Sequence, residues 1–214
     1  MEALDSPEYS AALEAADLVT PDGMPLVWML RWLGARAATR VYGPDLTPMV
    51  LEAAEEAGIP VGFYGSTDAV LQRLVGNFQR RFPRLTVAFA EAPPFRPLTS
   101  EEDHQTTAAI NAAGVRILFV GLGSPKQDRW MYAHRGRVQA VMLGVGAAFD
   151  FLAGVKPQAP RWMQRNGLEW LFRWATEPRR LGRRYLRQNP RFVVLAAAQI
   201  LRARWNAPAA ATTE

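Results

Sequence analysis

The chain has 214 residues, of which 49% are hydrophobic and 21% charged, with 16 Gly and 16 Pro. This length favours one domain with at most an appended segment, and the composition excludes disordered, collagenous and low-complexity classes. The absence of cysteine excludes disulfide frameworks, thiol nucleophiles and Cys-ligated metal centres. The first ten residues are too acidic and polar for a signal peptide, and no apolar run could span a bilayer, so we expect a cytoplasmic protein.

The net charge of +5 is distributed unevenly. Residues 161–205 contain eleven Arg against two Glu, interleaved with aromatic residues, whereas acidic residues are in excess elsewhere. Such a segment favours contact with phosphates of lipids, nucleotides or nucleic acid. The alternative is a solvated helical face.

Five short segments rich in β-branched and aromatic residues predict strands. They are residues 40–42, 61–64, 85–89, 116–120 and 140–145. Helices are predicted around them from capping residues, Pro and Gly. The predicted helices begin at Ser6-Pro7, at residue 27, at Thr47-Pro48, at Ser66 and at Ser100, and only helices are predicted after Pro160.

This alternation predicts an α/β fold with a Rossmann-like, mostly parallel sheet, helices on both faces, and a basic C-terminal helical appendage. We expect a core domain at 1–160 and the appendage at 161–214. Ligands of such sheets bind beyond the carboxyl ends of the strands, so the loops there are the candidate sites.

One candidate loop lies in ILFVGLGSPKQDRW, residues 117–130. Gly121 and Gly123 would let the backbone approach a ligand, and the following helix N-terminus would favour a phosphate. A dinucleotide fingerprint lacks its third glycine, because position 126 is Lys. The structural alternative is a capping box in which Ser124 is the N-cap and Gln127 is the third helical residue.

A second loop lies in LGVGAAFDFLAG, residues 143–154. Gly144 and Gly146 permit close approach, Phe149 could stack on a base or sugar, and Asp150 could accept hydrogen bonds from hydroxyls or a uracil imide. The structural alternative is a tight turn in which Asp150 caps a helix.

Two further segments carry charged residues beside turns. Asp22 lies in a Pro-Asp-Gly sequence, which turn chemistry alone explains, and Arg40 and Asp45 bracket what could be an ordinary surface turn. The chain has no DxD pair for a divalent metal and no GxSxG, HExxH or Walker A pattern. Hydrolase, zinc-protease and P-loop functions therefore have no support.

Taken in order, eight segments resemble the WecG/TagA/CpsF family, glycosyltransferase family 26. They are ADLVTPDGMPLVW, RVYGPDLT, VGFYGS, FPRLTV, APPF, ILFVGLGSPKQD, GVGAAFDFLAG and LEWLFRW with EPRRLGRRYL. The resemblance implies metal-independent, inverting transfer of a sugar from a UDP-sugar to an undecaprenyl-diphosphate-linked acceptor in cell-surface polysaccharide synthesis. It also implies no cofactor and a basic appendage docked on the inner face of the cell membrane.

The resemblance assigns roles to individual residues. Asp22 would be the catalytic base, Arg40 would contact the acceptor or the leaving diphosphate, and Gln127 would lie at the sugar site. The nucleotide-sugar pocket would comprise Gly121, Gly123, Gly144, Gly146, Phe149 and Asp150. Diphosphate and membrane contacts would come from Arg179, Arg183 and Arg184.

The sequence departs from the family pattern at three places. An upstream strand ending in Thr-x-Asn is expected in the family and this chain begins after it, so we expect a core without its first strand. Asp128 stands where Glu is common, and Gln158 stands where Arg is common.

Two alternatives from other classes stay open at this point. The Arg-rich and aromatic tail could make the chain a nucleic-acid-binding module, although the glycine-rich loops of an α/β body argue against this and we expect no nucleic-acid partner. A nicotinamide-dependent oxidoreductase lacks the full glycine fingerprint and a clear ribose-binding acid. The sequence leaves a homo-oligomer open.

Overall fold

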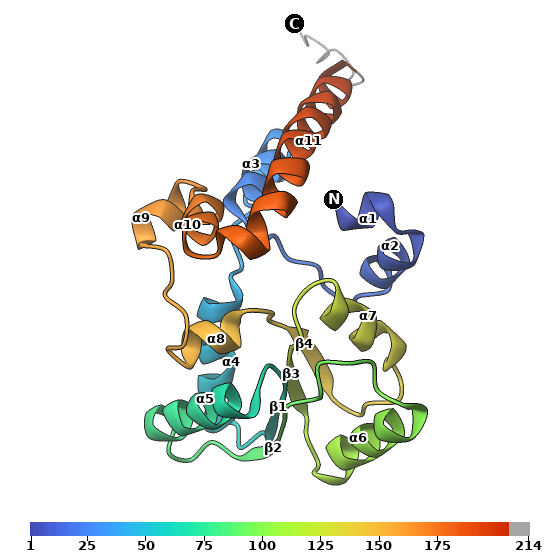
Figure 1. Ribbon diagram of the computed structural model, residues 1–214, viewed down its shortest axis with the longest axis vertical. Helices are drawn as coiled ribbons and strands as arrows, with labels where there is room; N and C mark the ends of the chain where they lie inside the picture. Colours follow the sequence, from blue (N-terminus) through green and yellow to red (C-terminus); the bar gives the residue numbers. More distant parts are fainter. Residues whose placement is uncertain (206–214) are drawn as a thin grey trace, which may run out of the picture. The chain divides into compact units, whose positions relative to one another are not determined.

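A computed structural model gives the fold of residues 1–205 (Figure 1). Within this range it describes the whole backbone and every side chain except those of Arg180, Arg184 and Arg204. Strands and helices alternate through the middle of the chain, and helices alone follow Pro160. The α/β class predicted from the sequence is therefore confirmed.

The chain divides into two compact units. The sheet unit consists of Glu2–Val19 and Tyr42–Gln158, and the helical unit consists of Met1, Thr20–Val41 and the chain from Ala159 on. Thr20–Val41, which the sequence analysis placed in the core domain, clusters with the C-terminal segment.

Four strands of the described chain form one parallel sheet in the order β2-β1-β3-β4. They are β1 (Val61–Gly65), β2 (Val87–Glu91), β3 (Ile117–Gly121) and β4 (Val141–Gly144). Each matches a predicted strand within two residues at its start. The strand predicted at 40–42 is wrong, because Val41 donates its N–H to the carbonyl of Pro21 and the segment joins no sheet.

Helices flank the strands of the sheet unit. They are α1 (Glu2–Asp5), α2 (Pro7–Glu14), α4 (Gly43–Glu56), α5 (Asp68–Arg81), α6 (Ser100–Ala112), α7 (Lys126–Ala133) and α8 (Ala148–Leu152). Ser6 caps α2 as predicted, whereas Thr67 rather than Ser66 caps α5 and Thr99 caps α6. Helix α4 begins at Gly43, so the predicted start at Pro48 is wrong and that proline lies inside the helix.

Alternate side chains of the strands supply two cores, one on each face of the sheet. Phe63 and Phe119 point to one face, where their rings stack 5.4 Å apart beneath residues of α4, α5 and α8. Tyr64, Leu118 and Val120 point to the other face, beside α6 and α7. Figure 1 shows these two groups of helices on opposite sides of the strands. Helices on both faces leave the carboxyl edge of the sheet for the loops that carry the sequence motifs.

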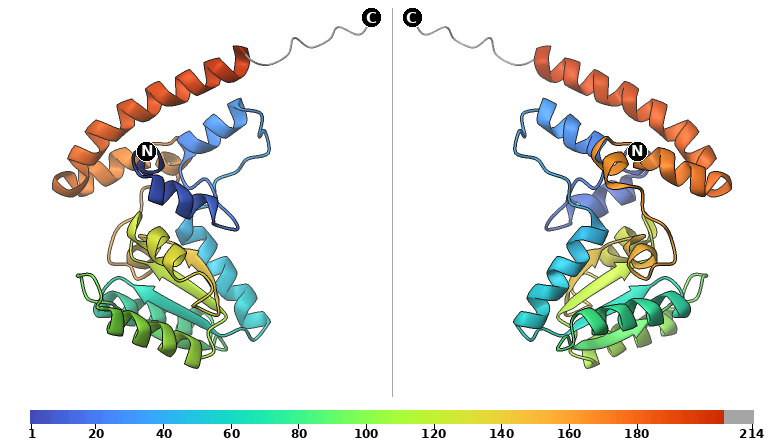
Figure 2. Two further views of the ribbon diagram at one scale, coloured as in Figure 1. Left: turned by 90° about the vertical axis from the view of Figure 1, so that its right-hand side faces the viewer. Right: turned by 90° about the vertical axis from the view of Figure 1, so that its left-hand side faces the viewer.

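The helical unit contains α3 (Met24–Trp32), α9 (Arg161–Arg165), α10 (Glu169–Thr176) and α11 (Pro178–Trp205). Helix α11 is one continuous helix and includes Pro190 (Figure 2). It packs against α10 and α3. Gly167 allows a further close approach, since a Cβ there would lie 2.8 Å from the ring of Trp28. These contacts join two segments that are far apart in the sequence.

Candidate functional site

The carboxyl ends of β1 and β3 meet at unusually close backbone distance. Gly65 pairs in register with Gly121 and has a φ of 129°, and a Cβ on Gly65 would lie 2.5 Å from the carbonyl carbon of Gly121. The chain order of the sheet reverses between these strands, which is the topological switch point where α/β sheets bind ligands. The loops after β1, β3 and β4 are therefore the candidate ligand-binding part of the sheet unit.

Phe149 fills the space that Gly121 leaves open. A Cβ on Gly121 would lie 2.5 Å from the ring of Phe149, which is 0% exposed and packs edge-on against Phe63. The packing of this ring is that of a core residue, and it offers no open face for stacking on a base. The assignment of Phe149 and Gly121 to the nucleotide pocket stays a prediction.

Gln127 connects the helix after β3 to the loop after β4. Its Oε1 accepts the backbone N–H of Gly146 at 2.9 Å, and the side chain is buried. A Cβ on Gly144 would lie 2.9 Å from Nε2 of Gln127, so this glycine makes room for the amide. The capping box considered for Ser124 and Gln127 is wrong, because the N-cap of α7 is Pro125 and makes no side-chain capping bond.

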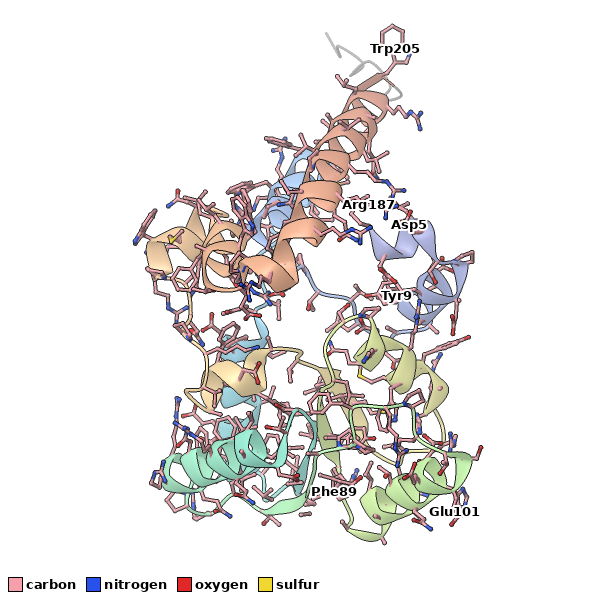
Figure 3. All side chains as sticks on the ribbon, in the orientation of Figure 1. Asp5, Tyr9, Phe89, Glu101, Arg187 and Trp205 are labelled. Carbon is pink, nitrogen blue, oxygen red and sulfur yellow. The ribbon has the colours of Figure 1, made fainter. Side chains whose placement is uncertain are left out.

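Ser124 instead contacts the N-terminal part of the chain. The hydroxyl of Tyr9 lies 3.2 Å from Oγ of Ser124 and donates to Oδ2 of Asp128 at 2.9 Å. Figure 3 labels Tyr9, which lies on α2 beside α7. Burial raises the pKa of the Tyr9 hydroxyl, with the nearby Asp128 carboxylate adding to the rise. The SPKQD turn is therefore fixed from two sides, by Tyr9 and by Gln127.

Asp150 lies in a polar cluster at the same edge of the sheet. Its carboxylate accepts a hydrogen bond from Oγ of Ser66 at 3.3 Å and pairs with Nζ of Lys156 at 2.7 Å. The N-cap of α8 is Ala147, so the capping role considered for Asp150 is wrong. Ser66 has a φ of 62°, a left-handed conformation that is uncommon outside glycine and that concentrates at functional sites. Sequence analysis considered Ser66 only as a helix cap and did not select Lys156.

Gly123 has a φ of 79° and no atom within 4 Å of the place where a Cβ would be. The loop after β3 is thus open at this residue, as a ligand-binding loop would require.

Asp22 and Arg40 lie close together in the helical unit. The Nε–H of Arg40 donates to the backbone carbonyl of Asp22, and its Nη2 lies 3.7 Å from Oδ1 of the same residue. Two residues that sequence analysis did not select also contact Arg40. Its Nη2 lies 2.5 Å from Oε2 of Glu169 on α10, and its Nη1 donates to Oε1 of Gln164 on α9 at 3.4 Å.

The Asp22 carboxylate is exposed, with 72% of its side chain accessible, yet its pKa is raised above the ordinary value of 3.8. The largest cause of the raised pKa is that neighbouring protein groups displace part of the water around the carboxylate. The positive charge of Arg40 lowers the pKa, the negative charge of Glu169 raises it, and Arg173 lowers it. A carboxylate with a raised pKa is a better proton acceptor, which is what a general base requires.

The arginines of α11 are exposed where their side chains are described. Arg179 and Arg183 point to solvent, and the side chain of Arg184 lies outside the described residues. Apolar residues are exposed on the same helix, namely Leu186, Val193, Val194, Leu195, Leu201 and Trp205. Figure 3 labels Arg187 and Trp205 on this helix. Within residues 1–205, no helix combines the length and apolar character needed to cross a bilayer.

The candidate residues thus fall into two groups. Asp22, Arg40, Arg179 and Arg183 belong to the helical unit, and Gln127, the four glycines, Phe149 and Asp150 belong to the sheet unit. In the part of the chain that the structure describes, no cluster of three His, Asp or Glu side chains could hold a metal ion.

Comparison with known proteins decides the family. The model of the glycosyl transferase WecG/TagA/CpsF family matches residues 1–206. The chain belongs to the WecG/TagA/CpsF family. It is also 31% identical over 180 residues to an N-acetylglucosaminyldiphosphoundecaprenol N-acetyl-beta-D-mannosaminyltransferase of Bacillus spizizenii, covering 84% of this chain and 68% of that protein.

Membership of the WecG/TagA/CpsF family confirms the resemblance that the ordered motifs predict, and makes the chain a glycosyltransferase. The nucleic-acid-binding and oxidoreductase alternatives are thereby set aside. The roles of the individual residues are not tested by the family match, so they stay predictions.

Proposed function

We propose that this glycosyltransferase moves an N-acetylmannosamine-type hexose from a UDP-sugar to an N-acetylglucosamine-diphosphate-lipid acceptor in the synthesis of a cell-surface polysaccharide. The name of the Bacillus relative, which states this sugar and this acceptor, supports the proposal. The observation that carries it within the chain is the contact of Asp22 with Arg40, beside Glu169.

The proposed reaction is an inverting displacement at the anomeric carbon. The acceptor hydroxyl attacks that carbon, Asp22 takes the hydroxyl proton, and the bond from the carbon to the diphosphate oxygen breaks with its electron pair leaving on UDP. An inverting transfer needs one such base, and cations stabilise the charge on the departing diphosphate. Arg40 and the arginines Arg179, Arg183 and Arg184 are proposed for that second role, without a divalent metal.

The sheet unit is proposed to bind the UDP-sugar at the carboxyl edge of its strands. Gln127 would contact the sugar, and the glycine-rich loops with Asp150 would hold the nucleotide. The basic α11, with its exposed apolar residues, would dock on the inner face of the cell membrane, where a lipid-linked acceptor is found.

Sugar transfer from UDP-N-acetylmannosamine to a short-chain lipid diphosphate carrying N-acetylglucosamine tests this function directly. We expect a β-linked product by NMR, turnover in EDTA, and a loss of about 10² to 10⁴ in kcat for Asp22→Asn. Retention of anomeric configuration, a strict metal requirement, or near-normal turnover of Asp22→Asn would each contradict the corresponding part of the proposal.

A further inference from the structure

Arg40 is a shared donor inside the helical unit. Its guanidinium carries five N–H groups in a planar fork. One edge holds the backbone of Asp22, and the remaining edge meets the side chains of Gln164 and Glu169. Arg40 and Glu169 are mostly buried, with side chains 15% and 17% exposed, so this pairing is screened less than a surface ion pair.

Two carboxylates lie within reach of the same nitrogen atom. Nη2 of Arg40 is 2.5 Å from Glu169 and 3.7 Å from Asp22. The first distance is that of a charge-assisted hydrogen bond, and the second is that of a looser ion pair, longer than a normal hydrogen bond. Glu169 therefore binds the N–H group of Arg40 that would otherwise donate a hydrogen bond to Asp22.

A base that accepted a close bond from an arginine would lose much of its capacity to take a proton, because the bond stabilises its charged form. We propose that Glu169 is a positioning residue, which binds Nη2 of Arg40 and so keeps this nitrogen from moving closer to the Asp22 carboxylate, leaving the carboxylate available to the acceptor hydroxyl. This inference rests on the proposed role of Asp22 as the base.

The charges around Asp22 agree with this arrangement. Arg40 and Arg173 lower the pKa of the Asp22 carboxyl, and Glu169 is the side chain that opposes them. Removing the negative charge of Glu169 would lower the pKa of Asp22 in two ways. It deletes the charge that raises this pKa, and it frees Arg40 to turn towards Asp22. Glu169 also stands at the first position of α10, where a negative charge is favourable to the helix.

Two variants separate charge from shape. Glu169→Gln keeps the size of the side chain and one acceptor oxygen but removes the charge, and Glu169→Ala removes both. The matched control is Glu52→Gln, which removes a carboxylate from an exposed position of α4 in the sheet unit. Urea unfolding of all three variants reports any loss of the fold.

Turnover is measured as a function of pH for each variant. We expect kcat to fall at least about tenfold in Glu169→Ala and less in Glu169→Gln, with KM for the donor nearly unchanged. The acid limb of the kcat profile should move to lower pH in both, because Asp22 becomes a weaker base. Glu52→Gln should behave as the unaltered chain. A fall in kcat with an unmoved acid limb would show that Glu169 only stabilises the local structure, and would overturn the inference.

The titration of the Asp22 carboxyl, followed by ¹³C NMR, gives the same information without turnover. We expect its midpoint to move to lower pH in both Glu169 variants, and an unmoved midpoint would overturn the inference. On an Asp22→Asn background, Glu169→Ala should cause no further loss of kcat, because both changes act through one group. A full additional loss would again count against it. Near-normal turnover of Asp22→Asn alone would instead contradict the proposed role of Asp22 as the base. Failure of the proposed function and failure of this inference are therefore distinguishable.

Discussion

The side-chain oxygen of Gln127 accepts the backbone N–H of Gly146 at 2.9 Å and so holds together the loops that follow β3 and β4. Both partners belong to motifs that the sequence analysis selected separately. The contact makes them one structural feature at the carboxyl edge of the sheet.

Gln127→Ala should destabilise the sheet unit. The change leaves the N–H of Gly146 without its acceptor and opens a space beside Gly144, which we expect to lower the free energy of unfolding by about 1–3 kcal/mol. Urea unfolding measures this, and calorimetry should show weaker binding of the UDP-sugar. The control Gln72→Ala, on the exposed face of α5, should leave both quantities unchanged. Unaltered stability of Gln127→Ala would mean that the loop reorganises without the bond.

Gly121→Ala should also destabilise the fold, because its Cβ would lie 2.5 Å from the buried ring of Phe149. Overpacking of this kind costs about 1–3 kcal/mol. Gly76→Ala is a matched control in the interior of α5, where the nearest atom to the new Cβ is the end of Arg80 at 3.8 Å. That change should stabilise the protein by about 0.5–1 kcal/mol, since alanine is the better helix former. Equal effects of the two substitutions in thermal melts would contradict this account of Gly121.

Local sequence signals were sufficient for the sheet. The runs beginning at Val61, Ile117 and Val141 are apolar, are bounded by Gly or Pro, and form strands as predicted. Residues 40–42 carry the same local signal, but pairing in a sheet depends on distant partners. Here the Gly43-Pro44 sequence begins helix α4 immediately afterwards, and the proline in its first turn was a readable signal.

The candidate site was predictable only in part, for a similar reason. Asp22 and Arg40 were selected from the family motif, and the structure brings them together. Glu169 has no local signal that separates it from a surface glutamate at a helix start. Its importance depends on Arg40, which is 129 residues away in the sequence and becomes a neighbour only in the folded chain.

Asp22→Asn should leave the chain as stable as before or more stable at neutral pH. A carboxyl whose pKa is raised by folding binds protons more tightly in the native state, so stability falls as pH rises from the ordinary value of 3.8 through the raised value. The neutral amide avoids this loss, and the advantage should disappear below pH 3.8. Urea unfolding at pH 7 and at low pH measures the difference, with the exposed Asp17→Asn as control. A less stable Asp22→Asn at pH 7 would mean that the folded state favours the charged carboxylate.

Binding of UDP should not require a divalent cation. The described residues offer no cluster of three carboxylate or imidazole groups for a metal, and the sequence has no DxD pair. Calorimetry with UDP in EDTA, repeated with Mg²⁺ and with Mn²⁺, should give one affinity within a factor of about two. Loss of binding in EDTA with recovery on addition of either metal would contradict the proposed mechanism.

The arginines of α11 should bring the protein to anionic membranes. Arg179, Arg183 and Arg187 are exposed on this helix, and each Arg near an anionic surface contributes about 1 kcal/mol to binding. Replacing all three by Gln should therefore weaken co-sedimentation with vesicles containing anionic lipid on the order of a hundredfold at low salt. The matched control replaces Arg73, Arg84 and Arg116, three exposed arginines of the sheet unit, and loses the same charge.

If net charge alone caused the association, both triple variants would bind equally weakly. If α11 is the docking element, the control should still sediment, and raising the salt concentration should release it because the attraction is screened. The exposed apolar residues of α11, among them Leu186 and Trp205, should then leave a weaker, salt-resistant component in the Gln variant. Unchanged sedimentation of that variant would show that these arginines form a solvated helical face and that another surface reaches the lipid.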